Sequence, residues 1–323
     1  MRVLFMGTPD FAVDTLTELL NSRHEVIGVV TQPDKPKGRG GKMQCSPVKE
    51  VAVKENICVY QPVKVRDEAF LYEVRRLDPD VIVVVAFGQM LSKELLEMPK
   101  YGCINVHASL LPKLRGAAPI QWAVINGEKE TGVTIMQMDE GIDTGDILMM
   151  EKYTLEEKET GGSLFEHLAK LGGPLLLKAL DAVEKEELQP IPQNDEEHTY
   201  AKMLNKATGK IDFSMDACSI ERLIRGLNPW PSAYCYLQNK MLKIWEADVV
   251  ECEEAKEKGC ILTDGEAGKV VLVTKKELLV QTANGCLSLK SVQLEGKKRM
   301  DIEAFLRGFH VQEGEYLKSE KDV

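Results

Sequence analysis

The stretch DVIVVVAFG, at residues 80–88, carries the strongest β-strand signal in this chain. It is a continuous run of β-branched residues without polar alternation, a pattern typical of a parallel strand that is covered on both faces. Further apolar strands are expected at 2–7, 25–32 and 102–107. The first half of the chain is therefore expected to build a largely parallel sheet.

Segments with helical periodicity lie between these strands. Apolar residues recur at helical spacing over 9–22 and over 67–78. Thr8 is the expected N-cap of the first of these helices, and Pro9 its first residue. The alternation of strand and helix predicts a parallel α/β sheet with right-handed crossovers. The first strand–helix turn reads GTPDF rather than GxGxxG, so the layout is Rossmann-like without the dinucleotide fingerprint.

The second half of the chain has a different character. Residues 163–185 form an amphipathic helical pattern with a Gly-Gly-Pro break, and the Pro-, Asn- and acid-rich stretch at 187–202 is interpreted as a linker. Short strands at a spacing of about ten residues then predict a small OB-like β-barrel. We therefore expect a Rossmann-like catalytic domain at 1–189, a linker at 190–207 and a C-terminal β-barrel at 208–323.

Composition excludes several classes of protein. No stretch approaches the roughly 20 apolar residues of a membrane span, and the chain starts directly with a strand-like run, so we expect a cytoplasmic protein without a membrane partner. The eight cysteines include no CxxC pair, which favours reduced thiols and no metal site. The net charge of −10 argues against a general nucleic-acid binder, although residues 33–54 carry six Lys and Arg against two acids.

Polar residues follow an apolar strand in NVHASLLPKLRG, at 105–116. Asn105 and His107 are two positions apart, so both side chains point to the same side of the strand, at the edge where open α/β sheets bind ligands. An amide and an imidazole N–H aimed at one point would suit a developing oxyanion. A purely structural histidine is the alternative.

A second polar segment, MQMDEGIDTGDIL at 136–148, contains four carboxylates among glycines. It is either a solvated acidic turn or a loop that holds Asp143 inward. An inward Asp143 beside His107 would favour the imidazolium and orient the ring, and it could accept a proton from an attacking amine.

These two segments together resemble the signature of the formyltransferases that use 10-formyltetrahydrofolate. Over nearly the full length, the resemblance is to the methionyl-tRNA formyltransferase family. Its motifs are GTPDFA (7–12), TQPDKPKGRGGK (31–42), SPVK (46–49), VVVAFGQML (83–91), GCINVHASLLPKLRGAAPIQWA (102–123) and NPWPSA (228–233). The resemblance implies transfer of a formyl group from 10-formyltetrahydrofolate to the α-amino group of initiator methionyl-tRNA, giving the formylmethionyl-tRNA of translation initiation.

The resemblance also implies roles for individual residues. Asn105, His107 and Asp143 would form the catalytic set, acting on a tetrahedral oxyanion formed by direct attack, without a metal. The folate would lie against Ser109, Leu110, Leu111, Pro112, Phe87, Gly88, Gln89, Met90 and Leu91. Core packing is the alternative role for the leucines. The tRNA would meet Arg39 first, together with Lys35, Lys37, Lys42, Lys206 and Lys210, and Arg222, Arg225 and residues 296–299 are further candidates.

Two rival functions stay open at this point. One keeps the chemistry and changes the acceptor to a small amine, such as an amino-sugar nucleotide or glycinamide ribonucleotide. The other is a non-catalytic RNA-binding protein.

Overall fold

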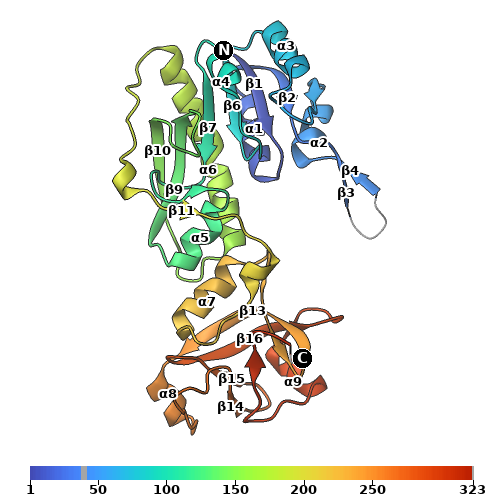
Figure 1. The fold of residues 1–323 in the computed structure, drawn as a ribbon, viewed down its shortest axis with the longest axis vertical. Helices are drawn as coiled ribbons and strands as arrows, with labels where there is room; N and C mark the ends of the chain where they lie inside the picture. Colours follow the sequence, from blue (N-terminus) through green and yellow to red (C-terminus); the bar gives the residue numbers. More distant parts are fainter. Residues whose placement is uncertain (38–41, 322–323) are drawn as a thin grey trace. The chain divides into compact units, whose positions relative to one another are not determined.

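A computed structural model describes residues 1–37 and 42–321 of the chain (Figure 1). The chain divides into two compact units, which are described separately. The first comprises Met1–Pro119, Lys129–Leu155 and Leu164–Ala201, and the second comprises Ile120–Glu128, Glu156–Ser163 and Lys202–Val323. Residues 190–201 of the expected linker thus belong to the first unit, and residues 202–207 to the second.

The first unit is built on a seven-stranded sheet in the order β10-β9-β7-β6-β1-β2-β5. Its strands are β1 (Arg2–Gly7), β2 (Glu25–Val30), β5 (Val59–Tyr60), β6 (Val81–Val85), β7 (Cys103–His107), β9 (Glu130–Gln137) and β10 (Ile147–Thr154). The five strands from β7 to β5 are parallel, whereas β9 runs antiparallel to β7 and β10 runs antiparallel to β9. All five residues of β6 are buried, as expected for a strand covered on both faces. The predicted Rossmann-like sheet is confirmed, with an antiparallel extension at the β10 edge.

Helices cover this sheet and connect its strands. Their bounds are α1 (Phe11–Leu20), α2 (Pro47–Lys54), α3 (Glu68–Leu77), α4 (Lys93–Glu97) and α6 (Gly161–Glu184). The helix α5 (Pro119–Asn126) lies almost wholly in the second unit. The N-cap prediction for the first helix is wrong, because α1 begins at Phe11 with Asp10 at its N-cap. Thr8 is used elsewhere: its hydroxyl donates to the Phe87 carbonyl oxygen at 3.4 Å and accepts from the Gln32 N–H at 3.3 Å.

The break expected within 163–185 is also wrong, because α6 continues through Pro174. The preceding glycines serve close packing instead. A Cβ on Gly172 would lie 3.1 Å from Val106, and one on Gly173 would lie 2.6 Å from Cγ of Glu18. The Gly-Gly pair therefore lets α6 approach α1 and the central sheet.

Residues 187–201 run along the β10 side of the first unit as an ordered segment. Ile191 forms an antiparallel bridge with Ile147, the first residue of β10. Farther on, β11 (Tyr200–Ala201) pairs in parallel with β8 (Arg115–Gly116), and the short helix η1 (Asp195–Glu197) lies between these two attachments. We call residues 187–201 the strap.

The second unit is an antiparallel sheet in the order β14-β15-β16-β13-β12-β18, with β17 paired to β16. Its strands are β12 (Ala233–Leu237), β13 (Lys240–Val250), β14 (Val270–Val273), β15 (Leu278–Gln281), β16 (Cys286–Leu294), β17 (Met300–Asp301) and β18 (Leu317–Lys318). Hydrogen bonds from the Val270 N–H to the Glu315 oxygen (2.7 Å) and from the Leu317 N–H to the Gly268 oxygen (2.8 Å) join the two ends of this order. The sheet therefore curls into the predicted barrel.

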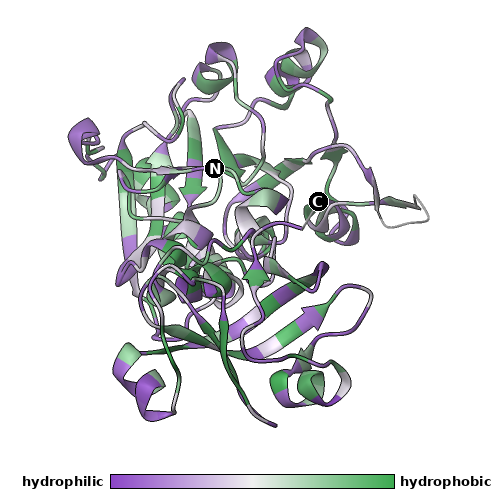
Figure 2. Ribbon diagram, turned by 60° about the horizontal axis from the view of Figure 1, so that its bottom comes forward, coloured by the Kyte–Doolittle hydropathy of each residue, from purple (hydrophilic) through white to green (hydrophobic). Residues whose placement is uncertain are grey.

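The core of this barrel is formed by hydrophobic residues that alternate with hydrophilic residues along its strands. Figure 2 shows hydrophilic and hydrophobic residues in bands along strands of this unit, the pattern of a sheet with one buried face. The long strand β13 follows this pattern, with Leu242, Ile244 and Ala247 buried. Besides α5, this unit contains the helices α7 (Ala217–Gly226), α8 (Cys252–Glu257), α9 (Ile302–Gly308) and the short η2 (Lys206–Gly209).

Candidate active site

Asn105, His107 and Asp143 come together at one place in the first unit. Asn105 and His107 are alternate residues at the end of β7, and both are buried. Asp143 lies in the loop between β9 and β10, and this loop folds back over β7. Its Oδ2 is 3.7 Å from Nδ1 of His107, and its Oδ1 is 3.5 Å from Nδ2 of Asn105. The three residues are thus neighbours. Strand alternation predicts the placement of Asn105 and His107, and the position of Asp143 matches the alternative in which the loop holds it inward.

Residues 114–116 fix the orientation of both the histidine and the carboxylate. Nε2 of His107 lies 3.0 Å from the Leu114 carbonyl oxygen. A carbonyl oxygen only accepts hydrogen bonds, so this contact assigns a proton to Nε2 and leaves Nδ1 facing Asp143. The N–H of Gly116 donates to Oδ2 of Asp143 at 2.8 Å. The carboxylate is therefore held between a backbone donor and the imidazole.

Left-handed backbone occurs at three points of this site. Leu114 has a φ of 59°, Asp143 a φ of 53° and Gly116 a φ of 112°. Aspartate tolerates this region better than most residues, but the conformation still costs about 1–2 kcal/mol. A side chain at Gly116 is excluded on a second ground, because its Cβ would lie 2.8 Å from the Ala201 carbonyl oxygen. Such strained conformations are typical of functional sites.

The residues after His107 divide between the core and the surface. Leu111 is buried against Met136 and Ile147, which supports its core-packing alternative. Ser109 is also buried, and its hydroxyl donates to the Lys113 carbonyl oxygen at 2.6 Å. Leu110 and Pro112 are partly exposed. Two of the four predicted folate contacts on this segment therefore present side-chain surface, and two are occupied within the protein.

The segment after β6 divides in a similar way. Phe87 and Leu91 are buried in the core of the first unit, and the side-chain oxygen of Gln89 accepts from the Val65 N–H at 3.1 Å. Gly88 and Met90 are exposed, with Met90 59% accessible. A ligand could meet this segment through exposed backbone and through Met90.

The predicted tRNA contacts lie in different parts of the chain. Arg39 lies outside the described residues. The backbone of the flanking residues forms an antiparallel pair of strands, β3 (Lys35–Lys37) and β4 (Lys42–Gln44), and Lys35 is exposed. Lys206 is exposed in the second unit, where Nζ of Lys210 pairs with Oε1 of Glu320 at 2.8 Å. That hydrogen bond raises the pKa of Lys210.

The base of the β3–β4 hairpin is tied to the first unit by a polar cluster. Nζ of Lys49 donates to Oδ2 of Asp34 and to Oε1 of Gln61, both at 2.7 Å. Nε2 of Gln61 donates in turn to Oδ1 of Asp34 at 2.8 Å. The hydrogen bond from Lys49, followed by that from Gln61, lowers the pKa of the Asp34 carboxyl. Asp34 is therefore a charged anchor directly before the basic hairpin.

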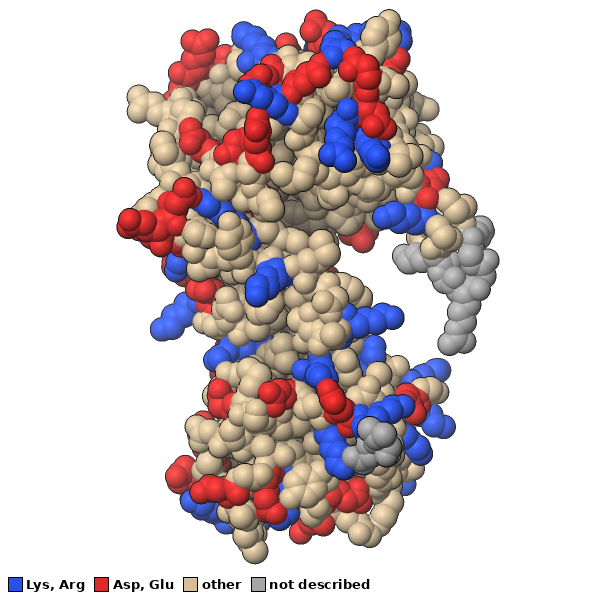
Figure 3. Space-filling model, in the orientation of Figure 1, with Lys and Arg blue, Asp and Glu red and all other residues tan. Residues whose placement is uncertain are grey.

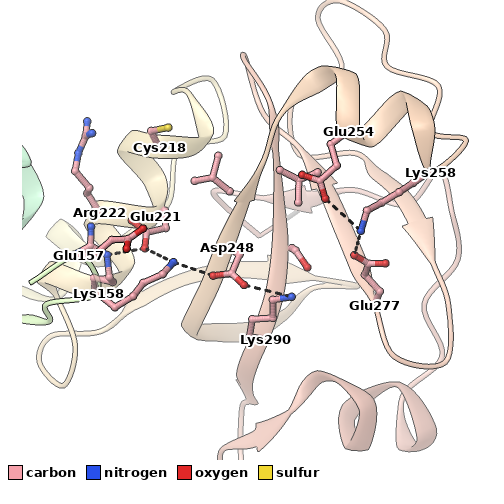
Figure 4. A pocket seen from close by; sticks show the side chains of 14 residues that line it. Glu157, Lys158, Cys218, Glu221, Arg222, Asp248, Glu254, Lys258, Glu277 and Lys290 are labelled. Atoms are coloured by element: carbon pink, nitrogen blue, oxygen red, sulfur yellow. Dashed lines mark hydrogen bonds and ion pairs between the residues drawn. The ribbon is translucent and has the colours of Figure 1, made fainter.

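A pocket of about 570 Å³ lies within the second unit, between α7, β13 and α8 (Figure 4). Its lining is balanced in charge, with five basic residues (Lys158, Arg222, Arg225, Lys258 and Lys290) and five acidic residues (Glu157, Glu221, Asp248, Glu254 and Glu277). Asp248 accepts from Nζ of Lys158 at 2.9 Å and lies 3.5 Å from Nζ of Lys290. Figure 3 likewise shows acidic and basic side chains interspersed over the face of this unit that it displays.

Two features that the sequence analysis missed are Arg115 and Gln193. Arg115 is almost fully buried, at 2% exposure, and its guanidinium donates to Oε1 of Gln193. A charged residue inside the motif at 105–116 is a sequence signal that could have led to this arginine and its partners. Gln193 gave no such signal, because it lies in a stretch with the composition of a linker.

Among residues 1–37 and 42–321, no cluster of three or more His, Cys, Asp or Glu side chains is arranged to hold a metal ion. Within the same ranges, no helix combines the length and the apolar character needed to cross a bilayer.

Comparisons with known proteins agree with this two-part architecture. Residues 1–180 match the family model for formyl transferase, and residues 203–310 match that for the formyl transferase C-terminal domain. The chain is 55% identical to a methionyl-tRNA formyltransferase of Lachnospira eligens over 98% of this chain and 99% of that protein. It is 47% identical to the protein of the same name from Clostridioides difficile, over 97% and 99% of the two chains.

Solved structures show the same fold at low identity. An N-formyltransferase from Helicobacter canadensis, in complex with folinic acid and dTDP-3-aminofucose, matches with a TM-score of 0.64 at 18% identity, over 90% of this chain and 98% of that chain. HypX from Aquifex aeolicus, in complex with tetrahydrofolic acid, matches with a TM-score of 0.61 at 18% identity, over 98% of this chain and 50% of that chain.

Proposed function

This chain belongs to the methionyl-tRNA formyltransferase family, and we propose that Asn105, His107 and Asp143 carry out its formyl transfer. The donor is 10-formyltetrahydrofolate and the acceptor is the α-amino group of initiator methionyl-tRNA. The observation that carries the proposal is the convergence of an amide, an imidazole and a carboxylate at the end of β7, with Asp143 within 3.7 Å of both partners.

The reaction begins with attack of the amine on the formyl carbon. An α-amine with a pKa near about 8 is partly neutral at cellular pH, so it attacks without a strong base. A new C–N bond forms and the carbonyl oxygen becomes an oxyanion. The amide of Asn105 and the imidazolium form of His107, which carries a proton on Nδ1 as well as on Nε2, stabilise this oxyanion, a contribution worth about 3 kcal/mol per donor.

Proton transfer completes the reaction. Asp143 accepts the proton that the attacking amine loses, directly or through water. The tetrahedral intermediate then collapses, the bond from carbon to N10 breaks, and N10 of tetrahydrofolate takes up a proton. The protons and electrons balance without a covalent enzyme intermediate, and the mechanism assigns no step to a metal.

The folate is proposed to lie between the two segments that follow β6 and β7. Leu110, Pro112 and Met90 offer exposed apolar surface, and Gly88 offers exposed backbone. Solved relatives in this fold hold tetrahydrofolic acid or folinic acid. Because Ser109, Leu111, Phe87 and Leu91 are buried, they would act through backbone groups or as support, and Gln89 is engaged with Val65.

The acceptor tRNA is proposed to meet basic residues of both units. Lys35 of the hairpin is exposed, and by family resemblance Lys37, Lys42 and Arg39, which lies outside the described residues, would also contact the tRNA. The C-terminal barrel at 208–323 would add contacts to the tRNA phosphate backbone, with Lys206 exposed just before it. Phosphate contacts supply affinity in such complexes, while contacts to unpaired bases supply specificity. Since the acceptor is initiator tRNA, we expect the protein to act in the cytoplasm.

The decisive experiment supplies 10-formyltetrahydrofolate and compares acceptors. We expect rapid formation of formylmethionyl-tRNA, loss of this product in His107→Ala, and full activity in His310→Ala, a change at an exposed histidine of the second unit. Efficient formylation of an amino-sugar nucleotide or glycinamide ribonucleotide, with methionyl-tRNA left unmodified, would favour the small-amine alternative. Binding of tRNA without any formyl transfer would favour a non-catalytic protein.

A separate experiment tests direct transfer. Single-turnover mixtures of enzyme and formyl donor without tRNA should leave the protein mass unchanged. Accumulation of a formylated enzyme would overturn direct attack and require a covalent intermediate.

A further inference from the structure

The side-chain amide of Gln193 links the strap to the loop that carries Asp143. Its Nε2 donates to the carbonyl oxygen of Asp143 at 2.9 Å and to that of Gly145 at 2.7 Å. Its Oε1 accepts from Nε of Arg115 at 3.0 Å and from Nη2 at 2.8 Å. All four hydrogen-bonding positions of the amide are therefore used, and its orientation is fixed by donors on one side and acceptors on the other.

Arg115 anchors this link inside the protein. Its guanidinium is buried and also donates to Oδ1 of Asp195 at 2.8 Å. Burying a charged group is costly unless it is paired and hydrogen-bonded, and Asp195 and Gln193 meet that need. The Arg115 backbone N–H also donates to the Thr199 oxygen at 2.9 Å. The strap and residue 115 therefore hold each other at several points.

The Asp143 loop needs this support because its backbone is strained. Asp143 has a positive φ, a conformation that persists only where surrounding contacts over-determine it. Gly116 holds the carboxylate through its N–H, and the neighbouring Arg115 reaches the carbonyl of the same aspartate through Gln193. Asp143 is thus held at its side chain and at its backbone by two consecutive residues.

We propose that Gln193 is a positioning residue for formyl transfer, which acts by holding the backbone of the Asp143 loop and does not touch the substrate. The inference rests on the proposed function, since it assumes that Asp143 takes part in the reaction. A carboxylate displaced by about 1 Å can cost a reaction about 100-fold, so loss of this link should appear in the rate of the chemical step.

Two substitutions separate positioning from folding. Gln193→Ala removes the link altogether. Gln193→Glu keeps the shape and can still pair with Arg115, but it replaces the donor to the two carbonyls by an oxygen. We expect both variants to fold, with kcat reduced about 30- to 100-fold and KM for the folate and for tRNA changed less than about 3-fold.

The matched control is Asn194→Ala, on the same strap. Asn194 caps η1 by accepting from the Glu196 N–H at 3.1 Å, so its loss perturbs the strap locally without removing the bond to the Asp143 loop. Its kcat should stay within about 3-fold of the wild type. An equal loss of kcat in Asn194→Ala would overturn the proposal, because the effect would then belong to the strap in general.

Three further outcomes would also overturn it. The first is an unchanged kcat in folded Gln193→Ala and Gln193→Glu, and the second is a rise in KM at constant kcat. The third is loss of the folded state in both variants, which circular dichroism and thermal unfolding would detect. Failure of the proposed function is distinguishable, because it would appear as absence of formylmethionyl-tRNA in the wild-type enzyme. If the wild-type enzyme is active and His107→Ala abolishes this activity, but the Gln193 variants keep the wild-type kcat, only the positioning role of Gln193 is refuted.

Discussion

Replacement of Asn105 by alanine should slow formyl transfer about 100- to 1,000-fold with little effect on stability. In the structure, Nδ2 of Asn105 lies 3.5 Å from Oδ1 of Asp143, which is the outer limit of a hydrogen bond. Because of its length, this bond contributes no more than the lower end of the ~1.5–3 kcal/mol that a hydrogen bond to a charged group adds to stability. The same amide aimed at an oxyanion is worth about 2.7–4 kcal/mol, which corresponds to the stated loss of rate.

The assay for Asn105→Ala is rapid-quench single turnover with charged initiator tRNA and 10-formyltetrahydrofolate, accompanied by steady-state KM values and thermal unfolding. The control is Asn126→Ala, at the exposed end of α5, which should behave as the wild type. The assignment of Asn105 to the oxyanion would be refuted by a rate loss below about tenfold in a folded variant. A rise in the folate KM at constant kcat would instead make Asn105 a ground-state binding residue.

Three further predictions address other parts of the chain. Asp248→Asn should tighten tRNA binding severalfold at low salt, because it removes the carboxylate that pairs with Lys158 and raises the pKa of that lysine. If a salt titration shows unchanged affinity, the tRNA contacts lie elsewhere. Hydrogen bonds from Ser219 lower the pKa of Asp216, the N-cap of α7. Because the folded pKa is the lower one, this stabilisation exists above about pH 4 and is lost as the pH falls through the folded value. Asp216→Ala should therefore cost about 1 kcal/mol in denaturant unfolding at pH 7, and the cost should become smaller as the pH is lowered below about 4. Burial raises the pKa of Cys103 to about 12. In the folded protein, iodoacetamide should therefore label exposed Cys58 and leave Cys103 unmodified, as measured by peptide mass spectrometry. Labelling of both cysteines at similar rates would contradict the buried position of β7.

The features that the sequence predicts well are those that depend on local pattern. The β-branched run at 80–88 forms the buried strand β6, and strand alternation brings Asn105 and His107 to one side of β7. The first follows because a strand covered on both faces of a sheet needs apolar side chains throughout, and the second because side chains alternate along a strand with a period of two residues. The sequence left open whether Asp143 lies close to Asn105 and His107, because no local rule says which carboxylate of an acidic loop turns inward.

The wrong predictions share one cause, which is that a distant partner outweighs local propensity. Thr8 has the sequence position of an N-cap, but its hydroxyl bonds to the Phe87 carbonyl after another strand. Pro174 has the composition of a helix break, but the glycines before it allow α6 to pack against α1, and this packing keeps the helix continuous. Propensity is a weak prior wherever tertiary contacts of this kind are available.

The strap shows why the support of the site could not be derived from the sequence. Its Pro-, Asn- and acid-rich composition lacks the apolar periodicity of a strand or helix, so pattern reasoning assigns a linker. The same polar residues are what a buried arginine requires, because Arg115 can remain inside the protein only if acceptors such as Gln193 and Asp195 come to it. The arginine beside the catalytic motif and the polar segment about 80 residues later are therefore complementary parts of one structure. The proposed catalytic residues follow from a sequence motif, whereas the position of Asp143 depends on a pairing between distant residues that only the folded chain reveals.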